Sequence, residues 1–375
     1  MRAFALEPEQ QQWCEELRSL AAERFRPLAA EHGERPGVNR ALVAALGDTG
    51  LLERVFPADG TPARAMDLCL LRESLAHGCT EAETALALQG LGAYPLALSG
   101  TDEQRARWLP DVAGGRAVAA FALSEPGAGS DAAALSLAAV PAGDGWELRG
   151  TKTWISNAPH ADVYSVFART TDGAGARGVT AFLVPAGRPG LTGEPLRMLS
   201  PHPIGTLTFD GVPVTGADVL GTVDEGFGVA MRTLNLFRPS VGAFAVGMAQ
   251  SALDAAVAHA GSRTAFGGAL RELQAVSHQL AEMATRIEAA RLLVYAAAAA
   301  YDRGEEGIAH RAAMAKLLAT ETAQYAVDTA VQIHGAAALQ HGHLLEHLYR
   351  EVRAPRIYEG ATEVQRSIIA KELYA

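Results

Sequence analysis

The carboxylate of Glu359 is the side chain best suited to proton-transfer chemistry. It stands in the run Arg356-Ile357-Tyr358-Glu359-Gly360, shortly before a last predicted helix. A carboxylate held against apolar and aromatic surface loses hydration, so its pKa rises and it becomes a more effective base. We therefore expect Glu359 to be a catalytic base, with Glu363 one helical turn further on as the next candidate. The structural alternative is that Thr362 simply caps the last helix.

A glycine-rich motif follows a predicted strand in the middle of the chain. Its sequence is Ser124-Glu125-Pro126-Gly127-Ala128-Gly129-Ser130-Asp131. Glycines permit positive φ angles and close backbone approach, and exposed amides in such a turn can hold a phosphate or polarise a ring carbonyl. The glycine spacing differs from the dinucleotide-binding fingerprint, and no helix clearly follows. A plain turn between two strands is the structural alternative.

A tryptophan near the end of another predicted strand offers an aromatic surface. The motif is Gly150-Thr151-Lys152-Thr153-Trp154-Ile155-Ser156-Asn157. Trp154 can stack on an aromatic cofactor while the hydroxyl of Ser156 forms a hydrogen bond to it. The structural alternative is a tryptophan buried in the core, which is the commoner fate of an isolated one.

Two further motifs lie in the C-terminal half of the chain. Arg263-Thr264-Ala265-Phe266-Gly267, with Gln274 downstream, places a guanidinium next to an aromatic ring, which suits a pyrophosphate beside an adenine. Gln332-Ile333-His334-Gly335-Ala336-Ala337-Ala338 has small residues that admit a second backbone or a ligand. A helix break with a solvated arginine and tight helix packing are the respective structural alternatives.

A cluster of histidines has the composition of a metal site but not its spacing. His341, His343 and His347 lie close to Glu346 in the sequence. Their spacing matches no established zinc pattern, and the stretch is typical of a loop leading into a charged helix. We expect no metal here.

The elements that must position these residues change in type along the chain. Residues 8–113 have a helical pattern, in which Thr101 and Gln104 form a capping box for a helix over residues 102–109. Short β-rich runs follow, and Asp144-Gly145 predicts a hairpin between two of them. The predicted strands cover residues 119–123, 135–140, 146–155, 163–170, 179–184 and 207–214.

After Gly226 the chain is helical again and rich in alanine. Long helices with wide apolar faces, near residues 226–261, 270–303, 307–338 and 361–373, predict a four-helix bundle. The fold class is therefore α+β. We expect an N-terminal helical domain (1–116), a middle antiparallel β domain (117–222) and a C-terminal four-helix bundle (223–375).

Composition narrows the class of protein further. The 375 residues are 49% hydrophobic and 20% charged, as in ordinary soluble proteins, and the formal charge of −10 with scattered basic residues argues against a nucleic-acid partner. Apolar runs such as residues 292–301 are too short to span a bilayer, and residues 1–10 lack the features of a secretory signal. The low, odd count of three cysteines fits a reducing cytoplasm.

Taken together and in this order, the motifs resemble the acyl-CoA dehydrogenase family across nearly the whole chain. The specific matches are residues 122–131, 150–157, 263–267 and 356–365. The resemblance implies an FAD-dependent enzyme of fatty acid metabolism that converts an acyl-CoA to a trans-2-enoyl-CoA. Glu359 would remove the α-proton while the flavin N5 takes the β-hydride. The thioester carbonyl would be held by the flavin ribityl chain and the backbone amide of Glu359.

The resemblance also assigns binding residues and partners. It implies that FAD contacts Leu123, Ser124, Gly129, Ser130, Trp154, Ile155, Ser156, Arg263, Phe266, Gln274, Gln332, Gly335, Ala336, Ala361 and Glu363. It implies that substrate contacts Ser130, Arg238, Tyr358 and Gly360. A homotetramer would share each FAD between neighbouring subunits, and an electron-transfer flavoprotein would accept the electrons.

The chain departs from the family pattern at three places. Asn235 stands where many relatives have Asp, Ala336 to Ala338 replace a stretch with two more glycines, and the loop at residues 57–61 is shorter than usual. The first and third changes leave open a carrier-protein-bound acyl substrate. A non-catalytic flavin scaffold is the remaining alternative, against which the intact Tyr358-Glu359-Gly360 argues. Acyl-chain length would depend on N-terminal side chains that include Gln89 and Tyr94.

Overall fold

The computed structural model describes residues 6–57, 60–200 and 202–374. These residues form two compact units that interleave along the chain. The first unit holds the described residues up to Arg26, then Arg64–Glu83, and all from Asn235 onward. The second holds residues 27–63, apart from the gap, and Thr84–Leu234. Each unit is a packed body with its own core.

The N-terminal part of the chain is helical, as its pattern predicted. A capping box of Thr101 and Gln104 opens α6, with Gln104 N donating to Thr101 Oγ1 at 3.2 Å, so this expectation is confirmed. The helix runs past residue 109 to Ala113. The α-helices are α1 (Pro8–Leu20), α2 (Arg26–His32), α3 (Arg40–Asp48), α4 (Ala65–Gly78), α5 (Thr80–Ser99) and α6 (Asp102–Ala113).

The described residues of the second unit contain one seven-stranded sheet. The hydrogen-bonded order of its strands is β1-β4-β2-β3-β7-β6. β5 also pairs with β4, outside this order. The strands are β1 (Ala119–Ala122), β2 (Ala138–Ala142), β3 (Gly145–Ser156), β4 (Val163–Arg169), β5 (Val179–Pro185), β6 (Leu191–Leu196) and β7 (Ile204–Val214). The sequence analysis missed β6, because Gly193 and Pro195 interrupt its pattern.

The sheet is mixed, which corrects the expectation of a purely antiparallel domain. β2–β3, β3–β7, β4–β5 and β6–β7 are antiparallel, whereas β1 and β2 both pair with β4 in parallel. The predicted hairpin between β2 and β3 is present. Its turn is formed by Gly143 and Asp144, and Gly145 already pairs with Ala142, so the turn lies one residue earlier than the sequence indicated.

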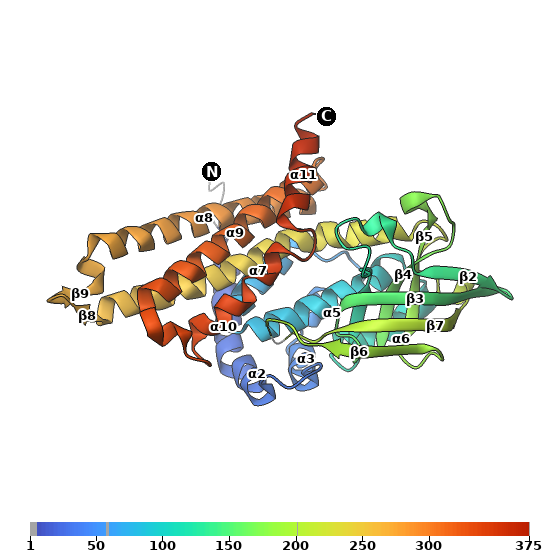
Figure 1. Ribbon diagram of the computed structural model, residues 1–375, viewed down its shortest axis with the longest axis horizontal. Coiled ribbons are helices and arrows are strands. Elements are labelled where there is room, and N and C mark those ends of the chain that lie inside the picture. Colours follow the sequence, from blue (N-terminus) through green and yellow to red (C-terminus); the bar gives the residue numbers. More distant parts are fainter. Residues whose placement is uncertain (1–5, 58–59, 201, 375) are drawn as a thin grey trace. The chain divides into compact units, whose positions relative to one another are not determined.

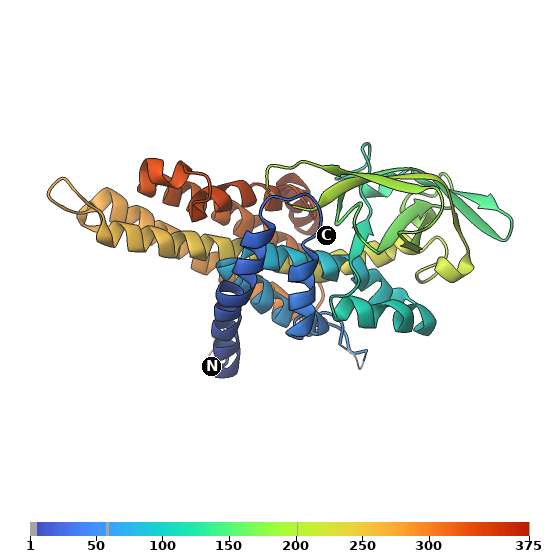
Figure 2. The same ribbon diagram turned by 90° about the horizontal axis from the view of Figure 1, so that it is seen from below.

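Helices of the second unit cover one face of this sheet, as Figure 2 shows with the sheet nearly edge on and α6 against it. Gly92 in α5 lies so close to the backbone of Ala119 that a Cβ atom would overlap it, and Ser165 Oγ donates to Gly92 O at 2.8 Å. From α6, Gln104 Nε2 donates to the carbonyl of Ala217 at 2.8 Å. α5 is therefore bonded directly to β4, and α6 to the 3-10 turn (Gly216–Asp218) that follows β7.

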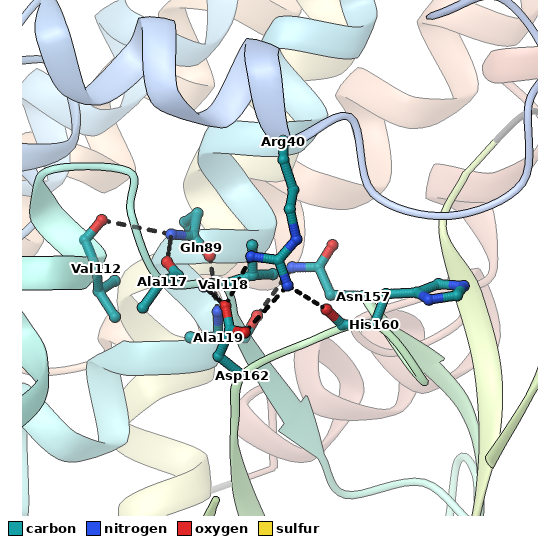
Figure 3. A network of polar contacts seen from close by, with 9 residues as sticks. All are labelled: Arg40, Gln89, Val112, Ala117, Val118, Ala119, Asn157, His160 and Asp162. Atoms are coloured by element: carbon teal, nitrogen blue, oxygen red, sulfur yellow. Dashed lines mark hydrogen bonds and ion pairs between the residues drawn. The ribbon is translucent and has the colours of Figure 1, made fainter. Parts of the chain in front are cut away.

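A polar network ties three segments of the second unit together at the start of β1 (Figure 3). Arg40 Nη1 donates to Asp162 Oδ2 at 2.9 Å, and that carboxylate accepts from Val118 N at 2.7 Å. Gln89 is fully buried, and its amide donates to Ala117 O and accepts from Ala119 N, both at 2.8 Å. The amide of Gln89 is thus committed to the backbone, and its contribution to acyl-chain length stays a prediction.

The C-terminal helices of the first unit form the predicted bundle. Figure 1 shows α7, α8 and α9 running side by side with α10 and α11 against α9. Close packing is possible because Gly242 of α7 faces Val294 of α8 and Ala319 of α9. The helices are α7 (Gly226–Ser262, in this unit from Asn235), α8 (Gln274–Asp302), α9 (Ile308–His334), α10 (Leu344–Glu351) and α11 (Thr362–Glu372).

Alanine is what lets α9 lie in the middle of this bundle. Ala312, Ala315, Ala319, Ala323 and Ala326 are almost completely buried, and small side chains allow the neighbouring helices to approach closely. α7 is long and apolar enough to span a bilayer by composition, but 72% of its most apolar window is buried inside the protein. Its apolar surface is therefore core surface.

Candidate active site

Glu359 lies on a short loop with an unusual backbone. The loop joins a 3-10 turn (Ala354–Arg356) to α11, and Glu359 has a φ of 50° while Gly360 has a φ of 93°. A left-handed conformation is strained for a residue with a Cβ atom and persists only where the surroundings enforce it. Such outliers concentrate at functional sites. A Cβ atom on Gly360 would also overlap the amide of Gln365, and the positive φ is itself strained for any other residue.

Two buried side chains hold this loop by its carbonyl oxygens. Lys316 Nζ, from α9, donates to Tyr358 O at 2.9 Å and to Gly360 O at 2.7 Å. Gln365 Nε2, from α11, donates to Gly360 O at 2.9 Å and to Glu359 O at 3.2 Å. Lys316 and Gln365 are both fully buried. The position of Glu359 is therefore fixed from two helices at once, and the sequence analysis identified neither anchor.

Glu359 is half-buried, and one oxygen of its carboxylate is shielded from solvent without a partner. Within the described residues, Glu359 Oε2 is inaccessible to solvent and accepts no hydrogen bond. Loss of hydration raises the pKa of Glu359, and the positive charges of Arg72, Lys316 and Arg238 lower it by less. An unpaired buried carboxylate oxygen beside cations is costly unless it has a ligand to act on. Glu359 therefore has the environment of a general base.

The cations around Glu359 come from different helices of the first unit. Arg72 of α4 is buried, bonds to the carboxylate of Glu83 and donates to Ser240 Oγ at 2.7 Å. Arg238 of α7 is 8% exposed, and its Nε makes no hydrogen bond among the described residues. Burial lowers the pKa of Arg238. Asn235 Oδ1 accepts from Arg238 Nη1 at 3.3 Å, so this departure from the family pattern bears directly on Arg238.

Three neighbours of Glu359 differ from it in contacts or exposure. Thr362 does not cap α11, which corrects that alternative, because the N-cap is Ala361 and Thr362 Oγ1 bonds to Glu321 Oε1 at 3.0 Å. Burial raises the pKa of the Tyr358 hydroxyl. Glu363 is exposed in the first turn of α11, so it lacks the desolvation that distinguishes Glu359.

In the second unit, a buried ion pair joins the two motifs predicted to face a flavin. Glu125 accepts from Ser136 N at 2.7 Å and Leu137 N at 2.8 Å, and Lys152 Nζ lies 2.8 Å from its Oε1. Lys152 Nζ also donates to Leu123 O at 2.8 Å. The motifs are further joined by Thr153 N donating to Ser124 O at 3.0 Å. Glu125 and Lys152 were not assigned a role from sequence, although charges inside such motifs were a signal.

The glycine motif itself is open to a ligand. Gly127 and Gly129 do not use the positive φ that glycine permits. A Cβ atom added to either glycine would meet nothing within 4 Å, so the backbone is accessible at both. Ser130 is exposed and Ser124 is half-buried. The motif therefore offers polar groups on an accessible loop rather than a filled turn.

Trp154 projects from the sheet instead of lying in the core. It is 51% exposed and has a φ of 55°, at a point where the β3–β7 register shifts. The next residue, Ile155, is 1% exposed, and Ser156 is half-buried. An exposed, conformationally strained tryptophan beside an open glycine loop fits the aromatic ring system and polar edge of a flavin.

The third and fourth motifs lie at the far end of the bundle from Glu359. A hairpin of β8 (Thr264–Ala265) and β9 (Gly268–Ala269) projects there, as Figures 1 and 2 both show. Phe266 at its tip is 93% exposed with a φ of 53°. His259 of α7 stacks on His334 of α9 with ring centroids 4.1 Å apart, which places the ends of both helices together.

Exposed polar and small residues surround that end of the bundle. Arg263 and Gln274 flank the hairpin. Gln332 lies in the last turn of α9, and Gly335 and Ala336 follow in a 3-10 turn (Gly335–Leu339). All five are exposed. Ala338 is fully buried. Lys316 and Gln332 lie on the same helix and are about 24 Å apart along its axis. The first unit thus carries two separate groups of candidate residues.

The side chains of the predicted histidine cluster each make a separate contact with another residue. His347 Nε2 lies 2.6 Å from Thr80 Oγ1, and His343 Nδ1 accepts from Leu345 N at 3.1 Å. His341 lies 3.6 Å from Glu346. In the part of the chain that the structure describes, no group of three or more His, Cys, Asp or Glu side chains converges as a metal site would require.

The chain matches the models of three domains of one known enzyme family. The chain matches the acyl-CoA dehydrogenase N-terminal domain over residues 7–116, the middle domain over 120–212 and the C-terminal domain over 224–374. This makes the protein an FAD-dependent oxidoreductase. The chain belongs to the acyl-CoA dehydrogenase family, and it acts on acyl-CoA.

Relatives cover almost the whole chain. Cyclohexane-1-carbonyl-CoA dehydrogenase of Geobacter metallireducens is 35% identical over 365 residues, which are 96% of each protein. The structure of butyryl-CoA dehydrogenase from Megasphaera elsdenii is 31% identical with a TM-score of 0.92, covering 99% of this chain and 100% of that one. A chain solved in a study of the electron transferring flavoprotein of Acidaminococcus fermentans is 34% identical, also with a TM-score of 0.92, covering 99% of both chains.

Proposed function

We propose that this enzyme removes the α-proton of an acyl-CoA with Glu359 and forms a trans-2-enoyl-CoA. The observation that carries the proposal is the buried, unpartnered Oε2 of Glu359 on a strained loop fixed by Lys316 and Gln365. A group intended only for stability would be paired. A base must instead keep one oxygen free for the proton that it accepts.

The surroundings of Glu359 support both its ionised form before the proton transfer and its protonated form afterwards. Arg72, Lys316 and Arg238 favour the ionised form, so the base can be ready before substrate binds. Burial favours the protonated form, so acceptance of the α-proton relieves the cost of a desolvated charge. In a thioester, loss of this proton requires stabilisation of negative charge on the carbonyl oxygen, and we assign one donor to the backbone N–H of Glu359.

Bound FAD would supply the acceptor for the β-hydride. In the second unit, Leu123, Ser124, Gly129, Ser130, Trp154, Ile155 and Ser156 are the proposed contacts to its flavin. Ile155 and Leu123 are buried, so we assign them backbone contacts, whereas the exposed Trp154 and half-buried Ser156 offer side chains. Ala361 and Glu363 complete the set proposed in the first unit, beside the substrate contacts Arg238, Tyr358 and Gly360.

We further propose a homotetramer in which each subunit completes a neighbour's FAD site. Arg263, Phe266, Gln274, Gln332, Gly335 and Ala336 would contact its adenine and pyrophosphate. Support comes from their place at the opposite end of the bundle from Glu359 and from the 93% exposure of Phe266. An aromatic ring so exposed at a strained turn is typical of a surface that another molecule covers. We expect an electron-transfer flavoprotein as acceptor and a cytoplasmic location.

Anaerobic mixing of the purified enzyme with a panel of saturated acyl-CoAs tests the proposal. At least one acyl-CoA should bleach the oxidised flavin, and its length and branching would define the substrate. Acyl groups on a carrier protein form a parallel arm, and faster bleaching by these would favour the carrier-bound alternative. A flavin that no thioester in either arm reduces would contradict the proposed reaction and favour a scaffold.

A matched pair of variants tests the assignment of the base. Glu359→Gln removes the basic electron pair with little change in size, and Glu363→Gln makes the same change one helical turn away at an exposed position. Glu359→Gln should lose flavin reduction, whereas Glu363→Gln, a change at a proposed FAD contact, should weaken FAD binding at most and keep flavin reduction when FAD is saturating. Retained reduction in Glu359→Gln with loss in Glu363→Gln would reassign the base to Glu363.

A further inference from the structure

Lys316 carries a buried ammonium that donates hydrogen bonds to two backbone carbonyls. Its side chain is fully buried, and its Nζ donates to Tyr358 O at 2.9 Å and Gly360 O at 2.7 Å. Burying a charge costs free energy unless it is well compensated, and a neutral donor could fix a loop at lower cost. Gln365 does so with its amide at the same Gly360 O. Positioning alone therefore does not explain why Lys316 carries a charge.

The chemistry of the peptide group suggests what the charge does. The Tyr358 carbonyl and the Glu359 N–H belong to one peptide unit, whose resonance couples the oxygen to the nitrogen. A charged donor at the oxygen draws electron density from the nitrogen and makes the N–H a stronger donor. The proposed function, on which this argument rests, assigns that N–H to the thioester carbonyl.

We propose that Lys316 is a positioning residue that polarises the Tyr358–Glu359 peptide and so strengthens the donor that stabilises the developing enolate oxygen. The ammonium of Lys316 thus has two effects on the reaction. Through Gly360 O it holds the left-handed turn that presents the carboxylate of Glu359. Through Tyr358 O it acts on the amide of the same residue.

The electrostatics of the site agree with this role. Burial lowers the pKa of Lys316 to about 8, and the negative charge of Glu359 opposes that fall. The ammonium form is therefore the main form near neutral pH. Its positive charge lies one peptide group away from the proposed oxyanion position, where stabilisation of developing charge is most effective in a desolvated site.

The test compares three variants of the FAD-loaded enzyme. Lys316→Met keeps most of the aliphatic stem but removes the charge and the donor, Lys316→Gln keeps a neutral donor, and Lys316→Arg keeps a charged one. The readout is the carbonyl stretching frequency of trans-2-enoyl-CoA, labelled with ¹³C at the thioester carbonyl, bound to the oxidised enzyme without turnover. Flavin reduction by the best saturated acyl-CoA is measured in parallel.

Polarisation by a charged donor predicts that the carbonyl band differs between the enzymes with a charged residue at position 316 and those with a neutral one. The bound carbonyl band should lie below its frequency in water in the wild type and in Lys316→Arg, and should return toward it in Lys316→Gln and Lys316→Met. The rate of flavin reduction should fall by about tenfold to a hundredfold in the two neutral variants, less than for full loss of an oxyanion donor. If Lys316→Met does not fold, Lys316→Gln carries the same comparison.

An unchanged carbonyl band in Lys316→Gln, whatever the rate, would overturn the inference and leave Lys316 as a structural anchor only. A slow Lys316→Gln enzyme with a shifted band supports it. Failure of the proposed function has a different signature, because then the wild type itself is not reduced by any acyl-CoA. The two failures are therefore distinguishable within one set of samples.

Discussion

The ammonium of Lys152 lies 2.8 Å from the carboxylate of Glu125, and both side chains are buried in the second unit. Lys152 precedes Trp154 on β3, while Glu125 belongs to the glycine motif. Burial lowers the pKa of Lys152 to about 8. For Glu125, burial alone would raise the pKa, but Lys152 and the backbone amides outweigh it and the pKa is lowered. The pair fixes the proposed flavin-facing loop against the strand that carries Trp154.

Removal of one partner should therefore weaken both stability and flavin binding. In Lys152→Met, the carboxylate of Glu125 stays buried without its cation, and breaking such a pair typically costs about 3–5 kcal/mol of unfolding free energy. Urea unfolding and the Kd of FAD report the two effects. Lys152→Met combined with Glu125→Gln should recover part of the loss, because no uncompensated charge remains. Equal FAD affinity in the wild type and Lys152→Met would show that the loop does not depend on the pair.

The Glu359→Gln variant should retain FAD and bind substrate but fail in the chemical step. We expect flavin reduction to slow by about a thousandfold or more, since without a base the α-proton has no acceptor. Stopped-flow spectroscopy under anaerobic conditions measures the rate, and the spectral shift on substrate binding reports that binding is intact. Near-wild-type reduction would assign the base to another residue.

Glu359 should also make stability depend on pH. Its folded-state pKa is raised, chiefly by burial, so its contribution to stability is fully present below the ordinary pKa and is lost as pH rises through the folded pKa. Glutamine does not titrate. The Tm of Glu359→Gln should therefore exceed that of the wild type by about 2 °C at pH 8, with a smaller difference at pH 5. A larger gain at pH 5 than at pH 8 would contradict the raised pKa.

Alkaline pH should slow flavin reduction through Lys316. Its pKa is lowered to about 8 by burial, so the ammonium is lost as pH rises through that value. The charged groups that act on it are Glu359, Arg238, Glu321 and Glu363, of which only Arg238 favours deprotonation. Rates measured between about pH 7 and pH 10 should fall in the wild type, whereas Lys316→Arg should show no fall near pH 8. An identical alkaline limb in both enzymes would point to another group.

Arg263 should affect cofactor binding although it lies far from Glu359 in the bundle. Arg263→Ala removes a guanidinium proposed to bind pyrophosphate, and we expect FAD affinity to fall by about tenfold to a hundredfold. Arg271→Ala is the control, because Arg271 is an exposed arginine in the adjacent 3-10 turn. Flavin fluorescence titration gives both affinities, and sedimentation tests the tetramer. A monomer with full activity, or unchanged affinity in Arg263→Ala, would contradict the shared site.

Several features were accessible from sequence because they depend on neighbours along the chain. The capping box of Thr101 and Gln104 is a local hydrogen-bond pattern, and it starts α6 as predicted. Alanine-rich helical periodicity predicted α7, α8, α9 and α11, and alternation predicted most strands of the sheet. Glu359 was selected for its place between Tyr358 and Gly360, and its loop indeed has a left-handed backbone.

Tertiary structure alone decided how these groups are charged, held and exposed. The chain brings Arg72, Arg238 and Lys316 to Glu359 from α4, α7 and α9, and nothing in the local sequence around any of them indicates this. The direction of Gln89 was open from sequence, and in the structure its amide forms hydrogen bonds with the backbone. Trp154, for which the core was the commoner alternative as an isolated tryptophan, is exposed. Desolvation and Coulomb interactions act through space, so a residue's pKa and accessibility depend on groups that only folding makes its neighbours.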